Sequence, residues 1–209
     1  NFLKKSLEKD SVSNLFYIWG EEGVGKSYIM QALNKELIGL NKKTLHLSLD
    51  DTRITSPEIL KNLDSLEAIL IEKLDKLEKT NDWETQLFNL VNEALNSETK
   101  IYLSSNIVSK DLEIELKDLK SRLSYFTAIE IPEITQDEKI DALRQSSARR
   151  GIELDEKTID FILNHTSRSL SDLLRLINEI DLYSLKKKRK VTPYLIRELL
   201  KVKSDKNHI

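Results

Sequence analysis

The chain has 209 residues, enough for one large domain or for a large and a small one, each with a hydrophobic core. Its 33 basic and 35 acidic side chains leave a formal net charge of -2, so no global field attracts it to DNA or to a membrane. It has no cysteine and no apolar run long enough to span a bilayer, which excludes a disulfide framework and favours a reducing, cytoplasmic compartment.

The first apolar run, Leu15 to Trp19, leads into a glycine-rich segment that fits the phosphate-binding pattern G-x-x-x-x-G-K-[ST]. Glycines allow successive backbone N–H groups to surround a β-phosphate, and the stretch from Ser27 to Leu40 favours a helix whose N-terminus points at the same anion. Lys26 would neutralise phosphate charge and Ser27 would offer a hydroxyl to Mg²⁺. We therefore expect a nucleotide site here, in preference to a turn that only links strand and helix. Its candidate residues are Gly20, Glu22, Gly23, Val24, Gly25, Lys26, Ser27 and Tyr28.

Short apolar segments alternate with helical patterns along the first part of the chain. This alternation predicts a parallel sheet with helices on both faces. A helix around residues 83–96 carries one apolar stripe that should pack on the sheet, formed by Leu87, Leu90, Val91, Ala94 and Leu95. The five expected strands are Leu15 to Trp19, Thr44 to Leu49, Ala68 to Ile71, Ile101 to Ser104 and Ala128 to Ile131.

After Ile131-Pro132 the strand patterns end and only helical patterns follow, so we expect a boundary between an α/β nucleotide-binding domain, residues 1–132, and a small helical domain, residues 133–209. Four helix starts are predicted there by capping residues, and the basic run 186–190 is expected to end the third helix. The caps are a capping box formed by Thr135 and Glu138, Asp155, Ser169, and Thr192 followed by Pro193.

Four motifs occur along the chain in the order Gly23 to Ser27, Leu103 to Asn106, Lys120 to Leu123 and Ile131 to Glu133. In this order they resemble one branch of the AAA+ proteins, the DnaA/Hda family, which comprises the bacterial replication initiator DnaA and its shorter relative Hda. The resemblance covers the chain from about Asn14 to Leu200, and it implies a P-loop core with a five-stranded parallel sheet followed by a helical lid. DnaA continues past its lid into a DNA-binding domain, whereas this sequence stops after a polar tail, so we expect the Hda type. Within the expected lid, the segment from Lys188 to Thr192 is also similar to Hda.

Hda-type proteins bind ADP, attach to the DNA-loaded sliding clamp and make DnaA hydrolyse its ATP, which ends initiation competence. The resemblance implies the same role here, with bound ADP or ATP and Mg²⁺. The implied partners are a DnaA-type initiator and the sliding clamp, and DNA is reached indirectly through the clamp. No membrane is involved, and homo-oligomers are possible. Arg122 matches the arginine finger of the family, which acts in trans on the initiator's nucleotide. Its other reading is a surface arginine in a charged segment, and the resemblance favours the finger.

Two positions depart from the family pattern. The strand ending at Ile71 should be followed by two acids, but Glu72 and Lys73 stand there; glutamate can reach Mg²⁺ through a water, whereas lysine has no acceptor. Asp75 is expected to point elsewhere. We therefore predict weak or no intrinsic ATPase activity. In the lid, Ser171 occupies the place of the sensor arginine, and Arg168 is the candidate substitute one turn earlier.

Asn106 matches the family position that contacts the γ-phosphate or the attacking water, and its other reading is an asparagine that starts a turn.

Two further functions stay open: an autonomous ATPase or helicase loader, which Lys73 disfavours, and a fragment of a DnaA-like initiator, which the polar tail 201–209 disfavours. The glutamine-leucine clamp motif of Hda relatives does not occur before the first strand. The similar segment Gln86 to Leu90 lies on the apolar stripe, where core packing is expected.

Overall fold

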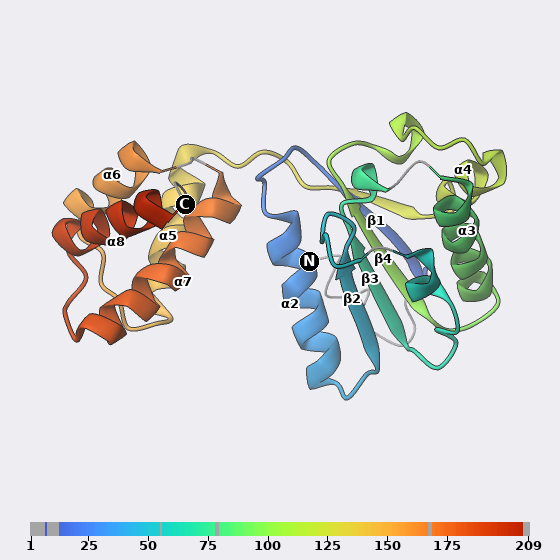
Figure 1. Cartoon of the computed structure of the whole chain (residues 1–209), viewed down its shortest axis with the longest axis horizontal. Helices are drawn as coiled ribbons and strands as arrows, with labels where there is room; N and C mark the ends of the chain where they lie inside the picture. The colour runs from blue at the N-terminus through green and yellow to red at the C-terminus, as the bar shows by residue number, and fades with distance from the viewer. Residues whose placement is uncertain (1–6, 8–12, 55, 78–79, 167–168, 207–209) are drawn as a thin grey trace. The chain divides into compact units, whose positions relative to one another are not determined.

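The computed structural model describes residues 7, 13–54, 56–77, 80–166 and 169–206, with side chains up to residue 201. The chain divides into two compact units, residues 1–132 and 133–209 (Figure 1). In the part of the chain so described, no helix combines the length and the hydropathy needed to cross a membrane.

The first unit is built on a five-stranded parallel sheet in the order β2-β3-β4-β1-β5, which confirms the predicted fold class. Each strand lies within one or two residues of its predicted range. The strands are β1 (Leu15–Trp19), β2 (Thr44–Ser48), β3 (Ala68–Glu72), β4 (Lys100–Ser105) and β5 (Thr127–Glu130). The connections contain α2 (Lys26–Gly39), η1 (Pro57–Leu60), η2 (Leu74–Lys76), α3 (Asn81–Leu95), η3 (Ser109–Asp111) and α4 (Lys117–Leu123).

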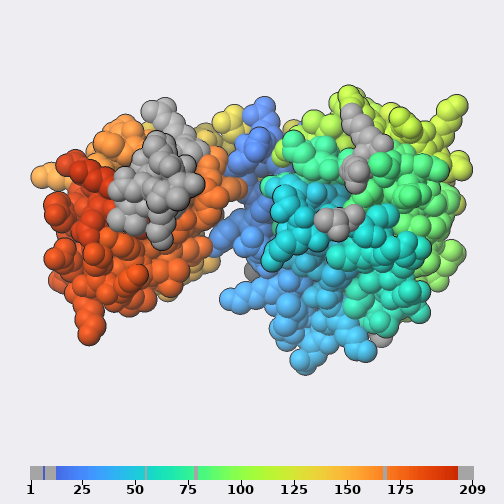
Figure 2. Space-filling model, viewed as in Figure 1, coloured from blue at the N-terminus to red at the C-terminus, as the bar shows by residue number. Residues whose placement is uncertain are grey.

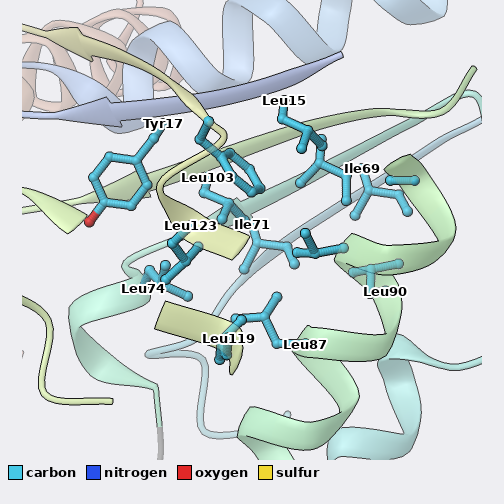
Figure 3. Packing of buried hydrophobic residues seen from close by; sticks show 14 of the residues in the cluster. Leu15, Tyr17, Ile69, Ile71, Leu74, Leu87, Leu90, Leu103, Leu119 and Leu123 are labelled. Carbon is cyan, nitrogen blue, oxygen red and sulfur yellow. The ribbon is translucent and has the colours of Figure 1, made fainter. Parts of the chain in front are cut away.

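Helices cover both faces of this sheet, α2 on one face and α3 with α4 on the other (Figure 1). Successive strand residues point to opposite faces, so each strand supplies both cores. Under α2 the rings of Phe16 and Tyr102 are stacked with centroids 5.0 Å apart. Figure 3 shows the core under α3 and α4, where Leu87, Leu119 and Leu123 meet the side chains of β1, β3 and β4.

One residue of the predicted stripe on α3 does not join the core. Leu87, Leu90, Val91 and Ala94 are buried, but Leu95 is 42% exposed. Leu95 is the last residue of α3, and it lies about a quarter of a turn from the centre of the stripe. The stripe therefore ends at Ala94.

Within the described residues of the second unit, four helices surround one core, and all four predicted caps are formed. Thr135 and Glu138 make the capping box, and the side chains of Asp155, Ser169 and Thr192 accept hydrogen bonds from backbone N–H groups three residues later. The helices are α5 (Gln136–Ala148), α6 (Glu156–His165), α7 (Leu170–Lys187) and α8 (Pro193–Lys206). Their core contains Leu143, Ile159, Ile162, Leu173, Ile177, Ile180 and Ile196.

The basic run 186–190 comprises the last two residues of α7 and the start of the turn to α8, on the surface of this unit (red in Figure 2). Lys188 ends α7 in the left-handed conformation, with φ of 53°. Glu198 fixes the turn because its carboxylate lies 2.8 Å from Lys187 Nζ and 3.7 Å from Arg189 Nη1. The predicted helix end is confirmed, and two cations of the run are paired internally.

Candidate nucleotide site

The glycine-rich segment forms the connection from β1 to α2, at the carboxyl edge of the sheet. Gly23 and Gly25 have φ values of 85° and 104°, a region that side chains with a Cβ rarely adopt. Gly20 is constrained by space, since an added Cβ would lie 2.4 Å from the carbonyl oxygen of Ile131. The loop therefore needs glycine for its curvature and for its close approach to the segment after β5.

Lys26 begins α2, and its side chain returns over this loop. Nζ donates hydrogen bonds to the carbonyl oxygens of Gly20, at 2.8 Å, and of Glu21, at 2.7 Å. The residue is buried, and burial lowers the pKa of its ammonium group, while the carboxylate of Asp75 is the largest of the charges that oppose this shift. The lysine is thus held at the loop, as a phosphate-binding role requires.

Glu72, the last residue of β3, is also buried at this edge of the sheet. Its Oε1 lies 2.7 Å from Nε2 of His46 in β2. The described residues contain no group of three or more histidines, cysteines or acids arranged to hold a metal. Ser27 and Glu72 nevertheless fit Mg²⁺, which in nucleotide sites takes one or two protein oxygens and completes its shell with phosphate oxygens and water.

Lys73, at the position where the family has a second acid, directs its ammonium group to a neighbouring acid at the same edge of the sheet. Its backbone is left-handed, with φ of 60°, and its ammonium group pairs with Asp50 after β2. This contact holds the pKa of the Asp50 carboxyl below its usual value. The structure thus explains where the unexpected positive charge lies.

Asp75 does not point elsewhere, and that prediction was wrong. The short helix η2 turns the chain back over the end of β4, so that the carboxylate accepts three hydrogen bonds from this strand end. Oδ1 accepts from Ser105 Oγ at 3.1 Å and from the Asn106 backbone N–H at 2.9 Å, and Oδ2 accepts from Asn106 Nδ2 at 3.0 Å. The sequence signal for such a turn was the three-residue spacing of Leu74 and Leu77, with Asp75 between them.

The other predicted residues lie where their elements place them. Val24 is buried, Glu22 is exposed and Tyr28 is 40% exposed on α2. Ser171 is half-buried near the start of α7, whereas Arg168 lies outside the described residues. The nucleotide roles of all of these remain predictions.

Arg122 lies near the end of α4, a helix that the sequence did not reveal. Leu119 and Leu123 anchor α4 in the core, and the half-buried Arg122 places its guanidinium 5.6 Å from the ring centre of Tyr125. The start of α4 is held by Glu84, a buried acid of α3 that sequence reasoning missed. Its carboxylate accepts the backbone N–H groups of residues 115 and 116, at 3.0 and 2.6 Å.

Comparison with known proteins agrees with this architecture. The model of the family "Hda, lid domain" matches residues 136–200. AMPPCP-bound DnaA from Aquifex aeolicus superposes with a TM-score of 0.69 over 88% of this chain, at 22% identity. Residues 136–200 thus match the lid of the Hda family, and the chain shares its fold with the AAA+ initiator DnaA. The family resemblance of the sequence is thereby confirmed.

Two further matches show how far the likeness extends along the chain. Domain III of the Thermotoga maritima replication initiation protein DnaA has a TM-score of 0.74 and 17% identity, covering 95% of this chain and 88% of that one. An uncharacterized protein of Haemophilus influenzae is 28% identical over 203 residues, which are 95% of this chain and 87% of the relative. By contrast, the chain spans only 61% of the Aquifex DnaA chain.

Proposed function

We propose that this protein binds an adenine nucleotide with Mg²⁺ and acts as a regulatory module that stimulates ATP hydrolysis by a DnaA-type initiator. The observation that carries the proposal is a complete phosphate loop beside a β3 end that lacks the second acid. The loop supports nucleotide binding, and the missing acid argues against fast hydrolysis by this chain itself.

The nucleotide would be held by the loop between β1 and α2. Backbone N–H groups of the loop and the N-terminus of α2 suit a polyphosphate, and Lys26 would exchange its carbonyl acceptors for phosphate oxygens. Ser27 and Glu72 would hold Mg²⁺, which supplies positive charge to the phosphates. The adenine preference rests on the DnaA relative that binds AMPPCP.

Slow intrinsic turnover follows from the way the acids of this edge are engaged. Glu72 is bonded to His46, and Asp75 accepts three hydrogen bonds from the end of β4. Because both carboxylates are already hydrogen-bonded within the protein, we expect neither of them to polarise a water at the γ-phosphate. A purified sample that turns ATP over at about 1 s⁻¹ or faster, in the range of ordinary enzymes, would contradict this part of the proposal and favour an autonomous ATPase.

Stimulation of the partner would depend on Arg122. A guanidinium that enters another protein's nucleotide site stabilises the charge on the transferred phosphoryl group, a contribution of about 10³ to 10⁵ in rate in other NTPases. The sliding clamp is the proposed second partner, with DNA reached through it. The segment Gln86 to Leu90 does not serve as the docking peptide, because Leu87 and Leu90 are buried in the core of the α/β unit.

The decisive experiment mixes this protein with ATP-loaded initiator, clamp and DNA, and measures phosphate release. Arg122→Ala should abolish stimulation and leave nucleotide affinity unchanged, whereas Lys26→Ala should lose the bound nucleotide. Arg53→Ala is the matched control, since Arg53 is an exposed arginine of the same unit that pairs with its neighbour Asp51. Full stimulation by the Arg122 variant would remove the finger assignment.

A further inference from the structure

The segment from residue 186 to residue 201, in the second unit, is strongly basic, although the chain as a whole is weakly acidic. Seven positive charges against one negative charge leave +6 in this segment, whereas the formal net charge of the chain is -2. All seven cations are exposed. A local excess of positive charge on one part of a domain is the electrostatic footprint of a polyanionic partner. The seven are Lys186, Lys187, Lys188, Arg189, Lys190, Arg197 and Lys201, and the acid is Glu198.

The one acid of this segment, Glu198, is engaged within the unit. Its carboxylate lies 2.8 Å from Lys187 Nζ and 3.7 Å from Arg189 Nη1, and it accepts a hydrogen bond from the Tyr183 hydroxyl at 2.7 Å. These contacts fix the turn between α7 and α8, so the cations of the segment stand on a firmly held scaffold. Among the described residues, no ion pair is found for the other lysines of the segment, which are Lys186, Lys188, Lys190 and Lys201.

The outer face of α8 combines these cations with an aromatic ring. Tyr194, Arg197 and Lys201 are at i, i+3 and i+7, so they lie on one face of the helix, over about 10 Å of its axis. Leu195 and Ile196, which follow Tyr194, are buried and anchor the helix, whereas the tyrosine is 71% exposed. A surface aromatic ring beside cations suits a nucleobase, which stacks on the ring while the cations contact the neighbouring phosphates.

The guanidinium of Arg197 is held by a short aromatic stack on α6. Its Cζ lies 5.3 Å from the ring centre of Phe161, and the rings of Phe161 and His165 are stacked with centroids 4.1 Å apart. A cation–π contact does not consume N–H donors in the way that an ion pair does, so this guanidinium can still bind a phosphate. Because α8 packs against both α6 and α7, the stack and the contacts of Glu198 hold its two sides in place.

Two exposed leucines of α7 adjoin the basic segment, and they raise the alternative of an anionic membrane. Leu182 is 69% exposed and Leu185 is 67% exposed. Other apolar residues of α7, among them Leu173, Ile177 and Ile180, are buried in the core, so this helix has no continuous apolar face to insert into a bilayer. The cations outnumber the exposed apolar side chains, and charge complementarity therefore favours a nucleic acid.

We propose that the basic face of the second unit, formed by residues 186–190 and by the outer face of α8, binds a single strand of nucleic acid directly. Its lysines and Arg197 contact the phosphates, and Tyr194 stacks on a base, which is accessible in a single strand and not in a duplex. The proposed function reaches DNA through the sliding clamp, so this contact goes beyond it. Nucleotide binding at the phosphate loop is not required.

The test measures the fluorescence anisotropy of labelled single-stranded DNA, of RNA with the same sequence and of the matching DNA duplex, each titrated with the full chain in the absence of nucleotide. We expect the two single strands to bind with similar affinity and the duplex to bind more weakly, because the contacts involve phosphates and a base face and not the 2′-hydroxyl. Affinity should fall steeply between about 50 mM and about 200 mM salt.

Two sets of variants separate the phosphate contacts from the stacking. Lys190→Gln with Lys201→Gln should weaken binding of every strand about tenfold at low salt, and should lower the slope of log affinity against log salt by about 1.4, because each phosphate contact contributes about 0.7. Tyr194→Leu should weaken single strands about tenfold and the duplex less than about twofold. Arg149→Gln with Lys157→Gln is the matched control. It removes two charges from exposed residues of the same unit outside the basic face, and it should change affinity less than about twofold.

The fold of each variant is checked by thermal unfolding followed by circular dichroism. The inference is overturned by absence of strand binding at about 50 mM salt, by an equal loss in the control pair, or by a duplex bound more tightly than the single strands. Attachment to vesicles of phosphatidylserine and phosphatidylcholine without strand binding also overturns it, and points to a membrane contact through Leu182 and Leu185. Because the titrations contain no nucleotide, their outcome is independent of the proposed nucleotide site.

Discussion

Replacement of Gly20 by alanine should destabilise the α/β unit, and the structure indicates by how much. The new Cβ would lie 2.4 Å from the carbonyl oxygen of Ile131, and that residue is fixed because its N–H donates to the Trp19 carbonyl at 2.7 Å. Overpacking of this kind costs about 1–3 kcal/mol, and the unfavourable φ of 156° adds about 1 kcal/mol. We expect about 3 kcal/mol in total, equivalent to roughly 10 °C in melting temperature.

The assay is thermal unfolding followed by circular dichroism, with ADP titration of the folded protein at 20 °C to measure the accompanying loss of affinity. Gly39→Ala is the matched control. An added Cβ at Gly39 meets nothing within 4 Å, and replacing this helical glycine should stabilise α2 by about 0.5 kcal/mol. A Gly20 variant that melts within about 1 °C of the wild type would refute the reasoning from the Ile131 contact.

Three other changes test separate parts of the molecule. Glu84→Ala should lower the free energy of unfolding, measured in urea, by about 3 kcal/mol, because backbone N–H groups at the start of α4 lose their charged acceptor. Glu93→Ala, at an exposed position of α3, the helix that carries Glu84, should lower it by less than about 0.5 kcal/mol. Hydrogen bonds from the side chain and then the backbone N–H of Thr158 lower the pKa of Asp155, so the stabilising effect of this cap is present above the unfolded pKa and is lost as pH falls through the folded pKa. Asp155→Asn should therefore lose less stability than the wild type between pH 5 and pH 2, and an equal loss in melting experiments would contradict this cap's role. Lys26→Met removes a buried charge, so the melting temperature without nucleotide should not fall, while ADP should no longer raise it.

Features set by neighbouring residues could be predicted from the sequence. The caps at Thr135, Asp155, Ser169 and Thr192 each depend on contacts within four residues, and all four are present. The phosphate loop was recognisable because its glycines, its lysine and its flanking elements are contiguous in the chain. Strand ends were placed within one or two residues because apolar runs stop where burial stops.

The missed contacts join residues about thirty positions apart. Asp75 contacts Asn106, and Glu84 contacts the backbone before α4. No sequence pattern near either acid indicates which distant residue it will contact. The sequence did contain one signal for Glu84, because this acid lies one turn before Leu87, on the buried stripe of α3. A buried acid must find donors, so its position alone predicted a partner, although not which one.

The order of the strands has a consequence for how the protein folds as it is synthesised. The first strand, β1, lies inside the sheet, and its two neighbours, β4 and β5, are translated more than eighty residues later. Until those segments leave the ribosome, an apolar strand with both edges open has no partner, and closing such long loops is slow. The lid helices contact near neighbours in the chain and can assemble quickly. Binding of early chains by a chaperone that covers apolar segments should therefore be strongest before Glu130 has emerged.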